Sequence, residues 1–392
     1  MNASLKSGKI KSDGEKTRLA SLDGIRGLTA LMLIVLHYAT ASWSFEPPYI
    51  PLPFPYPMDE LTQFMYRGVW GGVGVAIFFS LSGFAFMWSY QEKISRHDIS
   101  LKTFAVYRFS RLYPLCWLTS VIMLIISIID KELAGGIICD AYGVLKSFTV
   151  LGTFVLDAGA PTLNGVTWTL SLEIAMYGLF YLIAWNSDKV KERIVLYILP
   201  VLLGVTLLNL GITNLPLVNQ YFATALVGFF MGCITCEVYK TLCGSHYQKV
   251  VGYGCLACIF LFIFSWFCFG IEYYSRTYSS LNVTYSIVII PMLVFAALFV
   301  KPLQVVLSSR VLTCIGDLSF SIYLLHYVIL TIISLANKCG IIVFNASSPV
   351  NLLWVIWATL VASAVSYTCF ERPVQIWIRK KYHTYEEAKI DS

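Results

Sequence analysis

Long apolar stretches alternate with short polar segments along most of the chain. A helix of about 20 apolar residues spans a bilayer and satisfies its own backbone hydrogen bonds in lipid. The alternation therefore predicts an all-α, polytopic membrane bundle. We expect ten spans, at roughly 19–43, 69–90, 107–129, 166–185, 194–211, 218–239, 249–270, 282–300, 315–337 and 351–371.

The basic residues gather on one side of this arrangement. Twenty-two of the 28 Lys and Arg residues fall in segments on the side of the N-terminus, and five fall on the opposite side. This bias predicts that both termini are cytoplasmic and that the number of spans is even. Because topology and contact with membrane lipid account for the net charge of +6, we exclude nucleic-acid binding. We expect cytoplasmic tails at 1–18 and 379–392, disordered at 1–18 and from about 382, around one transmembrane domain at 19–378.

Three ionisable residues lie in the first span, LDGIRGLTALMLIVLHY (22–38): Asp23, Arg26 and His37. Ionisable groups inside a membrane are costly and usually mark function. Eleven residues of helix bring His37 back to nearly the direction of Arg26, about 16 Å deeper in the bilayer. A competing interpretation is a secretory signal cleaved after Ala41, which would remove this face.

The third span begins with YRFSRLYP (107–114), in which Arg108 and Arg111 share a helix face. Two such arginines can bind a phosphate through charge-assisted, forked hydrogen bonds. The alternative is an ordinary basic cluster at the cytoplasmic end of a span. Arg26, on the same side of the membrane, favours an anionic cytosolic ligand.

Further polar groups lie in the fourth, ninth and last spans. Glu173 in WTLSLE (168–173) needs a partner, a proton or water, and a structural ion pair would also explain it. His326 in SFSIYLLH (319–326) should lie at the depth of His37, with Tyr323 on the same face; it would otherwise be a packing histidine. Glu371 in FERP (370–373) is expected to pair with a cytosolic-side arginine, and Pro373 to end the last helix.

The cysteines predict little chemistry. The pairs Cys233/Cys236 and Cys255/Cys258 lie in apolar spans without convergent polar partners, so we expect helix packing and no metal site. Cys139 and Cys339 fall on the outer side, where a disulfide can form in an oxidising compartment. The segment EPPYIPLPFPYP (46–57) suits either a stiff connector or an aromatic surface for sugars.

Together these groups predict a polar cavity with a cationic cytosolic mouth, His37 at its centre and Glu173 in its outer part. A histidine is the natural general base for a hydroxyl group. One alternative is a proton-coupled secondary transporter of a small solute, with His37, Glu173 and His326 as the relay, although we find no internal repeat.

The motifs occur in the order found in a known family. The chain resembles the acyltransferase-3 family of integral membrane O-acyltransferases over about residues 20–375. The Arg-x10-His and Arg-x-x-Arg patterns match at Arg26/His37 and Arg108/Arg111, and FFSLSGF, WTLSLE, SFSIYLLH and FERP match further signatures. Many members have a second acid after the glutamate of the fourth motif; here Ile174 stands there, which leaves Glu173 alone.

The resemblance implies transfer of an acyl group, usually acetyl, from cytosolic acetyl-CoA to a hydroxyl of a cell-envelope carbohydrate. It implies no permanently bound cofactor, and a bacterial inner-membrane location with lipopolysaccharide or another polysaccharide or glycolipid as acceptor. His37 and Glu173 would be catalytic, and Arg26, Arg108 and Arg111 would bind the donor. The supporting residues would be Asp23, Ser82, Tyr113, Trp168, Ser171, Tyr323, His326 and Glu371.

Overall fold

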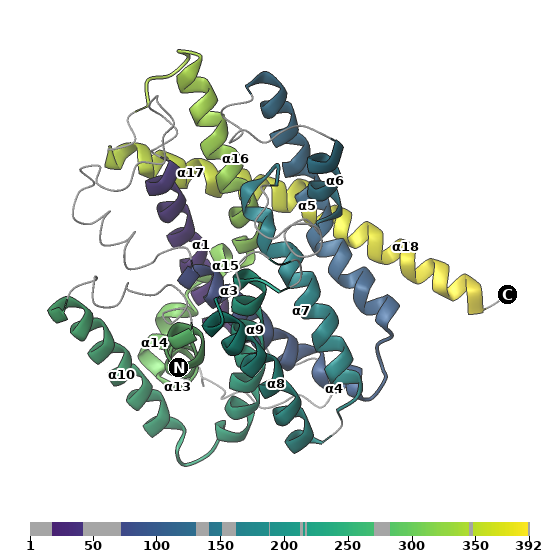
Figure 1. Ribbon diagram of the computed structural model, residues 1–392, viewed down its shortest axis with the longest axis vertical. Helices are drawn as coiled ribbons and strands as arrows, with labels where there is room; N and C mark the ends of the chain where they lie inside the picture. Colours follow the sequence, from purple (N-terminus) through teal and green to yellow (C-terminus); the bar gives the residue numbers. More distant parts are fainter. Residues whose placement is uncertain are drawn as a thin grey trace, which may run out of the picture.

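All regular elements in the described part of the chain are helices (Figure 1). The computed structural model describes residues 18–41, 72–130, 141–150, 162–187, 189–211, 215, 218–269, 283–344 and 348–390. The first half contains α1 (Ala20–Ala41), α3 (Gly72–Ser89), α4 (Gln91–Ser95), α5 (Leu101–Ile129), α6 (Ala141–Thr149), the 3₁₀ turn η3 (Gly165–Thr167), α7 (Trp168–Trp185) and α8 (Val190–Asn209). The second half contains α9 (Gln220–Leu242), α10 (Gln248–Phe269), η4 (Tyr285–Ile289), α13 (Ile290–Phe299), α14 (Lys301–Leu307), α15 (Arg310–Asp317), α16 (Ser319–Lys338), α17 (Pro349–Ser366), η5 (Tyr367–Glu371) and α18 (Arg372–Ile390).

Apolar helices coincide with all ten predicted spans. Within the described residues, eight helices are long and apolar enough to cross a membrane; Val73–Ser89 is a shorter apolar helix. Tyr285–Phe299 and Lys301–Leu307 make a ninth candidate if they are counted together, although the chain bends by 94° between them. Pro302 explains the bend, because its ring suits the first turn of a new helix. The helical membrane bundle is therefore confirmed, whereas the exact number of crossings and the cytoplasmic placement of the termini stay predictions.

Small residues bring α3 and α9 into backbone contact at the centre of the bundle. A Cβ atom added to Gly83 would lie 1.8 Å from the carbonyl oxygen of Phe229, and one added to Gly232 would lie 2.0 Å from that of Ser80. The Sγ atom of Cys233 lies 3.4 Å from the carbonyl oxygen of Gly83. Small residues at helix interfaces permit such close approach. Ser82, next to Gly83, is thereby fixed in position relative to the rest of the core.

The N-terminal end of α1 is held against α15. The guanidinium of Arg18 bonds both Asp23 and Asp317, each at 2.5 Å. The hydrogen bond with Asp23 is the largest cause that raises the pKa of Arg18. A Cβ atom on Gly316 would lie 2.1 Å from the carbonyl oxygen of Asp23. These contacts fix the direction of α1, and with it the positions of Arg26 and His37.

Two expectations about the C-terminal region are wrong. Pro373 does not end the last helix: π-helix η5 leads directly into α18, and the proline occupies the second position of α18. The π-helical turn before the proline changes the backbone hydrogen-bond pattern, so the helix continues past a residue that has no N–H to donate. Residues 382–390 are helical, not disordered, and Figure 1 shows α18 alongside α5 and then beyond the bundle. Tyr382 and Glu386 bond Thr103 and Lys102 of α5.

Other predictions fall outside the described residues. They are the disorder of residues 1–17, the connector or sugar-binding surface at 46–57, and the disulfide between Cys139 and Cys339.

Candidate active site

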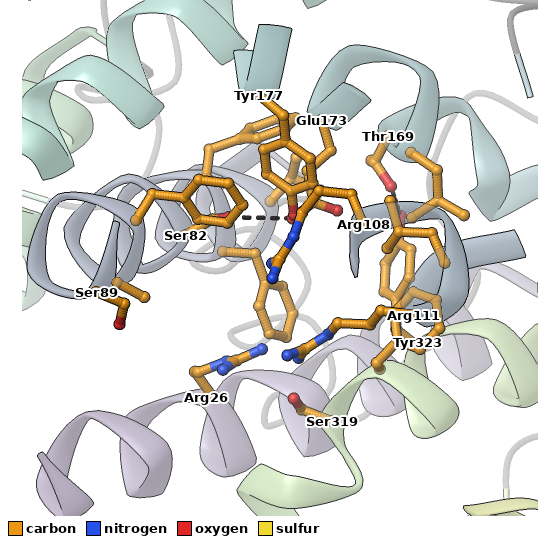
Figure 2. Close-up of a pocket in the computed structure, with 18 of the residues that line it drawn as sticks. Arg26, Ser82, Ser89, Arg108, Arg111, Thr169, Glu173, Tyr177, Ser319 and Tyr323 are labelled. Atoms are coloured by element: carbon orange, nitrogen blue, oxygen red, sulfur yellow. Dashed lines mark hydrogen bonds between the residues drawn. The ribbon is translucent and has the colours of Figure 1, made fainter. Parts of the chain in front are cut away.

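A cavity of about 260 Å³ lies between α1, α3, α5, α7 and α16, and three arginine side chains converge on it (Figure 2). Arg26 comes from α1, whereas Arg108 and Arg111 come from α5. The prediction that these three residues form one cationic site is therefore confirmed as geometry. The wall of this arginine cavity also contains polar residues, namely Ser82, Thr169, Glu173, Tyr177, Ser319 and Tyr323.

Aromatic rings hold Arg108 in place. Its guanidinium carbon lies 4.9 Å from the ring centre of Phe86, 4.8 Å from Tyr90 and 5.9 Å from Tyr177. Its Nη2 atom donates to the hydroxyl of Tyr90. The Nε–H is buried and has no hydrogen-bond partner among the described residues. Stacking suits a planar guanidinium, and a donor left unsatisfied inside the protein is costly. The site is thus arranged to receive an acceptor atom.

Arg26 and Arg111 also line a second, more polar cavity of about 240 Å³. Asp23, Glu371 and Arg372 contribute to its wall. Within the described parts of the chain, neither Arg26 nor Arg111 makes a hydrogen bond or an ion pair, and the same holds for Arg372. Guanidinium groups without an ion pair make the walls of both cavities cationic, so both cavities are suited to an anion.

The carboxylates around the second cavity already have partners. Asp23 accepts from Arg18, as described above. Glu371 accepts from Ser321 at 2.6 Å and from Ser366 at 2.9 Å. The structure shows no ion pair between Glu371 and an arginine in the described residues, so the expected pairing is wrong. Two serine hydroxyls satisfy this carboxylate instead and leave the arginines available to a ligand.

Glu173 lies in the wall of the arginine cavity and not in an outer chamber. Its Oε1 atom accepts a hydrogen bond from Ser82 at 3.1 Å and another from the hydroxyl of Tyr177 (Figure 2). Tyr177 follows Glu173 by one helical turn. The alternative explanation, a structural ion pair at Glu173, is not found in the described residues; hydroxyl groups hold the carboxylate in place. A carboxylate held in this way can accept a further hydrogen bond or a proton.

His37 and His326 form a pair on the other side of Tyr323. The Nε2 atom of His326 lies 3.1 Å from the Nδ1 atom of His37. The prediction that both histidines lie at the same depth is confirmed. The described wall of the arginine cavity includes neither of them. Tyr323 lines the cavity, and its ring centre lies 5.9 Å from that of His326.

A single cavity with Arg26, His37 and Glu173 in series is therefore not what the structure shows. Tyr323 lies between the two sites: it lines the arginine cavity beside Phe78, with ring centres 6.1 Å apart, and it contacts His326. The hydroxyl of Tyr323 donates to the carbonyl oxygen of Val166 and accepts from Thr169. These bonds fix the Tyr323 ring as part of the partition.

Three of the predicted supporting residues have structural contacts instead. Tyr113 donates to the backbone of Thr149 and thereby ties α6 to α5. The ring of Trp168 packs on Tyr221 at 4.9 Å, and Ser171 donates to the carbonyl oxygen of Trp168 in the first turn of α7. None of the three belongs to the described walls of the two cavities.

Sequence reasoning missed Arg372, Tyr90 and Tyr177. Arg372 was visible as the residue after Glu371 in FERP, and Tyr177 as the residue one turn after Glu173. Tyr90 had no signal, since its contact with Arg108 joins two different helices.

Comparison with known proteins decides the family. The chain matches the acyltransferase domain of the acyltransferase-3 family over residues 19–370, which is most of its length. The chain belongs to this family. It is also 29% identical over 166 residues to acyltransferase MdmB of Streptomyces mycarofaciens. That alignment covers 41% of this chain and 38% of the relative. No solved structure matches the chain.

The protein therefore belongs to a family of acyltransferases, and several of its described helices are long and apolar enough to cross a membrane. Family membership also makes acyl transfer a better account of the buried polar groups than proton-coupled transport. The arginine cavity and the histidine pair both lie within residues 19–370, the range that matches the family.

Proposed function

We propose that this protein is an O-acyltransferase that moves an acyl group, usually acetyl, from cytosolic acyl-CoA to a hydroxyl of a cell-envelope carbohydrate or glycolipid. The observation that carries the donor assignment is the convergence of Arg26, Arg108 and Arg111 on one cavity. Guanidinium groups that converge in this way suit phosphate oxygens, which they bind through charge-assisted hydrogen bonds. Acyl-CoA combines such phosphates with a long acyl-carrying arm.

His37 is the general base in this proposal. Its Nδ1 atom lies 2.9 Å from the carbonyl oxygen of Leu33, and a carbonyl only accepts, so Nδ1 carries the hydrogen. In the neutral ring Nε2 is then the basic atom. It takes the proton of the acceptor hydroxyl while the oxygen attacks the thioester carbonyl carbon. The C–S bond breaks, and the departing thiolate receives the proton from His37.

The helix geometry sets the reach that the donor needs. Arg26 and His37 are separated by about 16 Å along α1. The donor phosphates would bind at the cytosolic end near Arg26, and the acyl arm would extend past Phe78 and Tyr323 to His37. The described wall of the arginine cavity contains Glu173 but not His37, so we assign Glu173 to the donor cavity, where it can bond a polar group of the arm.

Membranes from cells that produce the protein test this function. The probe is labelled acetyl-CoA supplied to the cytosolic side, and the readout is label in the carbohydrate fraction, checked by mass spectrometry for added acetyl groups. We expect wild-type membranes to transfer label and His37→Ala membranes to transfer none at equal protein level. Equal labelling by His37→Ala would refute the role of the histidine, and no labelling above membranes without the protein would refute the proposed reaction.

A further inference from the structure

The partner of His37 is a second histidine from a distant part of the chain. His326 on α16 is fully buried, and its ring centre lies 4.8 Å from that of His37. Its Nδ1 atom lies 3.0 Å from the carbonyl oxygen of Ile322, one turn earlier in the same helix. Its Nε2 atom faces Nδ1 of His37 at 3.1 Å. Each imidazole is thus anchored to its own helix, and the planes of the two rings are tilted by 44°.

The carbonyl groups determine where the hydrogens lie. Because the carbonyl oxygen of Ile322 can only accept, the Nδ1 atom of His326 carries a hydrogen. In the neutral ring, Nε2 of His326 then bears a lone pair, and this lone pair points at Nδ1 of His37. The hydrogen on Nδ1 of His37 is shared between Leu33 and His326. The opposite tautomer of either ring would place two acceptors against each other.

We propose that His326 is a positioning residue for His37, the base of the proposed transferase on which this inference rests. By accepting the Nδ1 hydrogen of His37, His326 fixes the ring orientation and leaves Nε2 of His37 as the atom that takes the hydroxyl proton. The base and its orienting group then form the pair found in other acid–base sites, with a neutral imidazole in place of a carboxylate.

The hydrogen bond from His37 to His326 becomes stronger when His37 takes the proton. When Nε2 of His37 takes the proton, the ring becomes an imidazolium, and its Nδ1–H bond to His326 becomes charge-assisted. Stabilisation that grows as charge develops favours the transition state over the ground state. A merely space-filling residue at position 326 would provide no such gain.

The surroundings of His326 keep its ring from turning away. Asn164 donates to the carbonyl oxygen of Leu324 at 3.0 Å, and the hydroxyl of Tyr323 donates to that of Val166 at 2.9 Å. Both bonds attach this turn of α16 to η3. The acceptor on His326 is therefore presented in one direction, as a positioning role requires.

Two substitutions separate positioning from packing. His326→Phe keeps a ring of similar size but removes the acceptor, whereas His326→Gln loses the ring but can present its Oε1 atom to His37. Transfer of labelled acetate from acetyl-CoA is measured in membranes that contain the full chain, as initial rate against donor concentration at equal protein level. The thermal midpoint of each purified variant is recorded as well.

We expect His326→Phe to lower kcat about 10- to 100-fold, a part of the 10² to 10⁴ that a general base contributes, with an unchanged KM for acetyl-CoA. His326→Gln should recover most of the wild-type kcat. A Phe variant as active as the Gln variant or more so would overturn the positioning role while the transferase activity stands. Equal labelling by wild type and His37→Ala would instead overturn the proposed base, and the inference with it.

Discussion

Gly83→Ala should damage both the stability and the activity of this protein. The added methyl group would lie 1.8 Å from the carbonyl oxygen of Phe229, where real contacts of this kind do not fall below 3.0 Å. Helices α3 and α9 must therefore separate locally by about 1.2 Å. Overpacking of a tight core contact typically costs about 1–3 kcal/mol, which we expect as the loss in the free energy of unfolding.

The same displacement reaches the cavity. Ser82 is the neighbour of Gly83, and its hydroxyl bonds Glu173 at 3.1 Å. A shift of about 1 Å is enough to break this bond, since hydrogen bonds weaken steeply beyond normal distances. We therefore expect a reduced rate of acyl transfer in addition to the reduced stability, and Ser82→Ala should reproduce the rate effect alone.

Gly178→Ala is the matched control, because a Cβ atom there meets nothing within 4 Å. Alanine is about 0.5–1 kcal/mol better than glycine inside a helix, so this variant should be as stable as wild type or more stable. Thermal midpoints of the purified proteins in detergent and transfer rates in membranes are the measurements. A Gly83→Ala protein as stable as the Gly178→Ala protein would refute the backbone contact between α3 and α9.

Three further predictions concern charged groups. Arg108→Lys should raise the KM for acetyl-CoA about tenfold or more, because an ammonium cannot stack on the surrounding rings or donate in a fork, whereas Arg96→Ala, an exposed control on the same side, should leave it unchanged. Glu173→Gln keeps an acceptor for Ser82 but removes the charge; we expect normal folding by size-exclusion chromatography and a clear loss of transfer, and unchanged kinetics would make Glu173 a structural residue only. Arg18→Ala removes a half-exposed bridge and should cost only about 0–1 kcal/mol, with an effect on the thermal midpoint that shrinks as salt rises; a larger, salt-independent loss would contradict this view of the bridge.

The polar residues within apolar helices could be predicted because their cost in lipid makes each of them conspicuous. Arg26, Arg108 and Arg111 were found in this way and were placed on the same side of the membrane, which agrees with the one cavity that they line. The fold class followed from the same physics. Neither inference needed a contact between distant parts of the chain.

Contacts between side chains of different helices could not be predicted from the sequence in this way. The spacing of residues in one helix gives depth but not the rotation of a neighbouring helix. His326 was placed at the depth of His37, yet their contact across 289 positions follows only from how α1 packs on α16. The aromatic residues around Arg108 come from several helices, and Phe78 and Tyr323 fill a space that the sequence suggested was open. The prediction that Pro373 ends the last helix was wrong because a π-helical turn allows the chain to continue into α18.

The partition between the arginine cavity and the histidine pair is consistent with the chemistry proposed for them. A base that faced the donor cavity directly would also activate water against the thioester, and the donor would be hydrolysed. Phe78 and Tyr323 separate donor binding from the base, so that only the acyl end of a bound donor needs to pass them. Tyr323→Ala should then increase hydrolysis of acetyl-CoA, measured as free thiol without added acceptor, relative to transfer. A ratio of hydrolysis to transfer equal to that of wild type would refute this function of the aromatic partition.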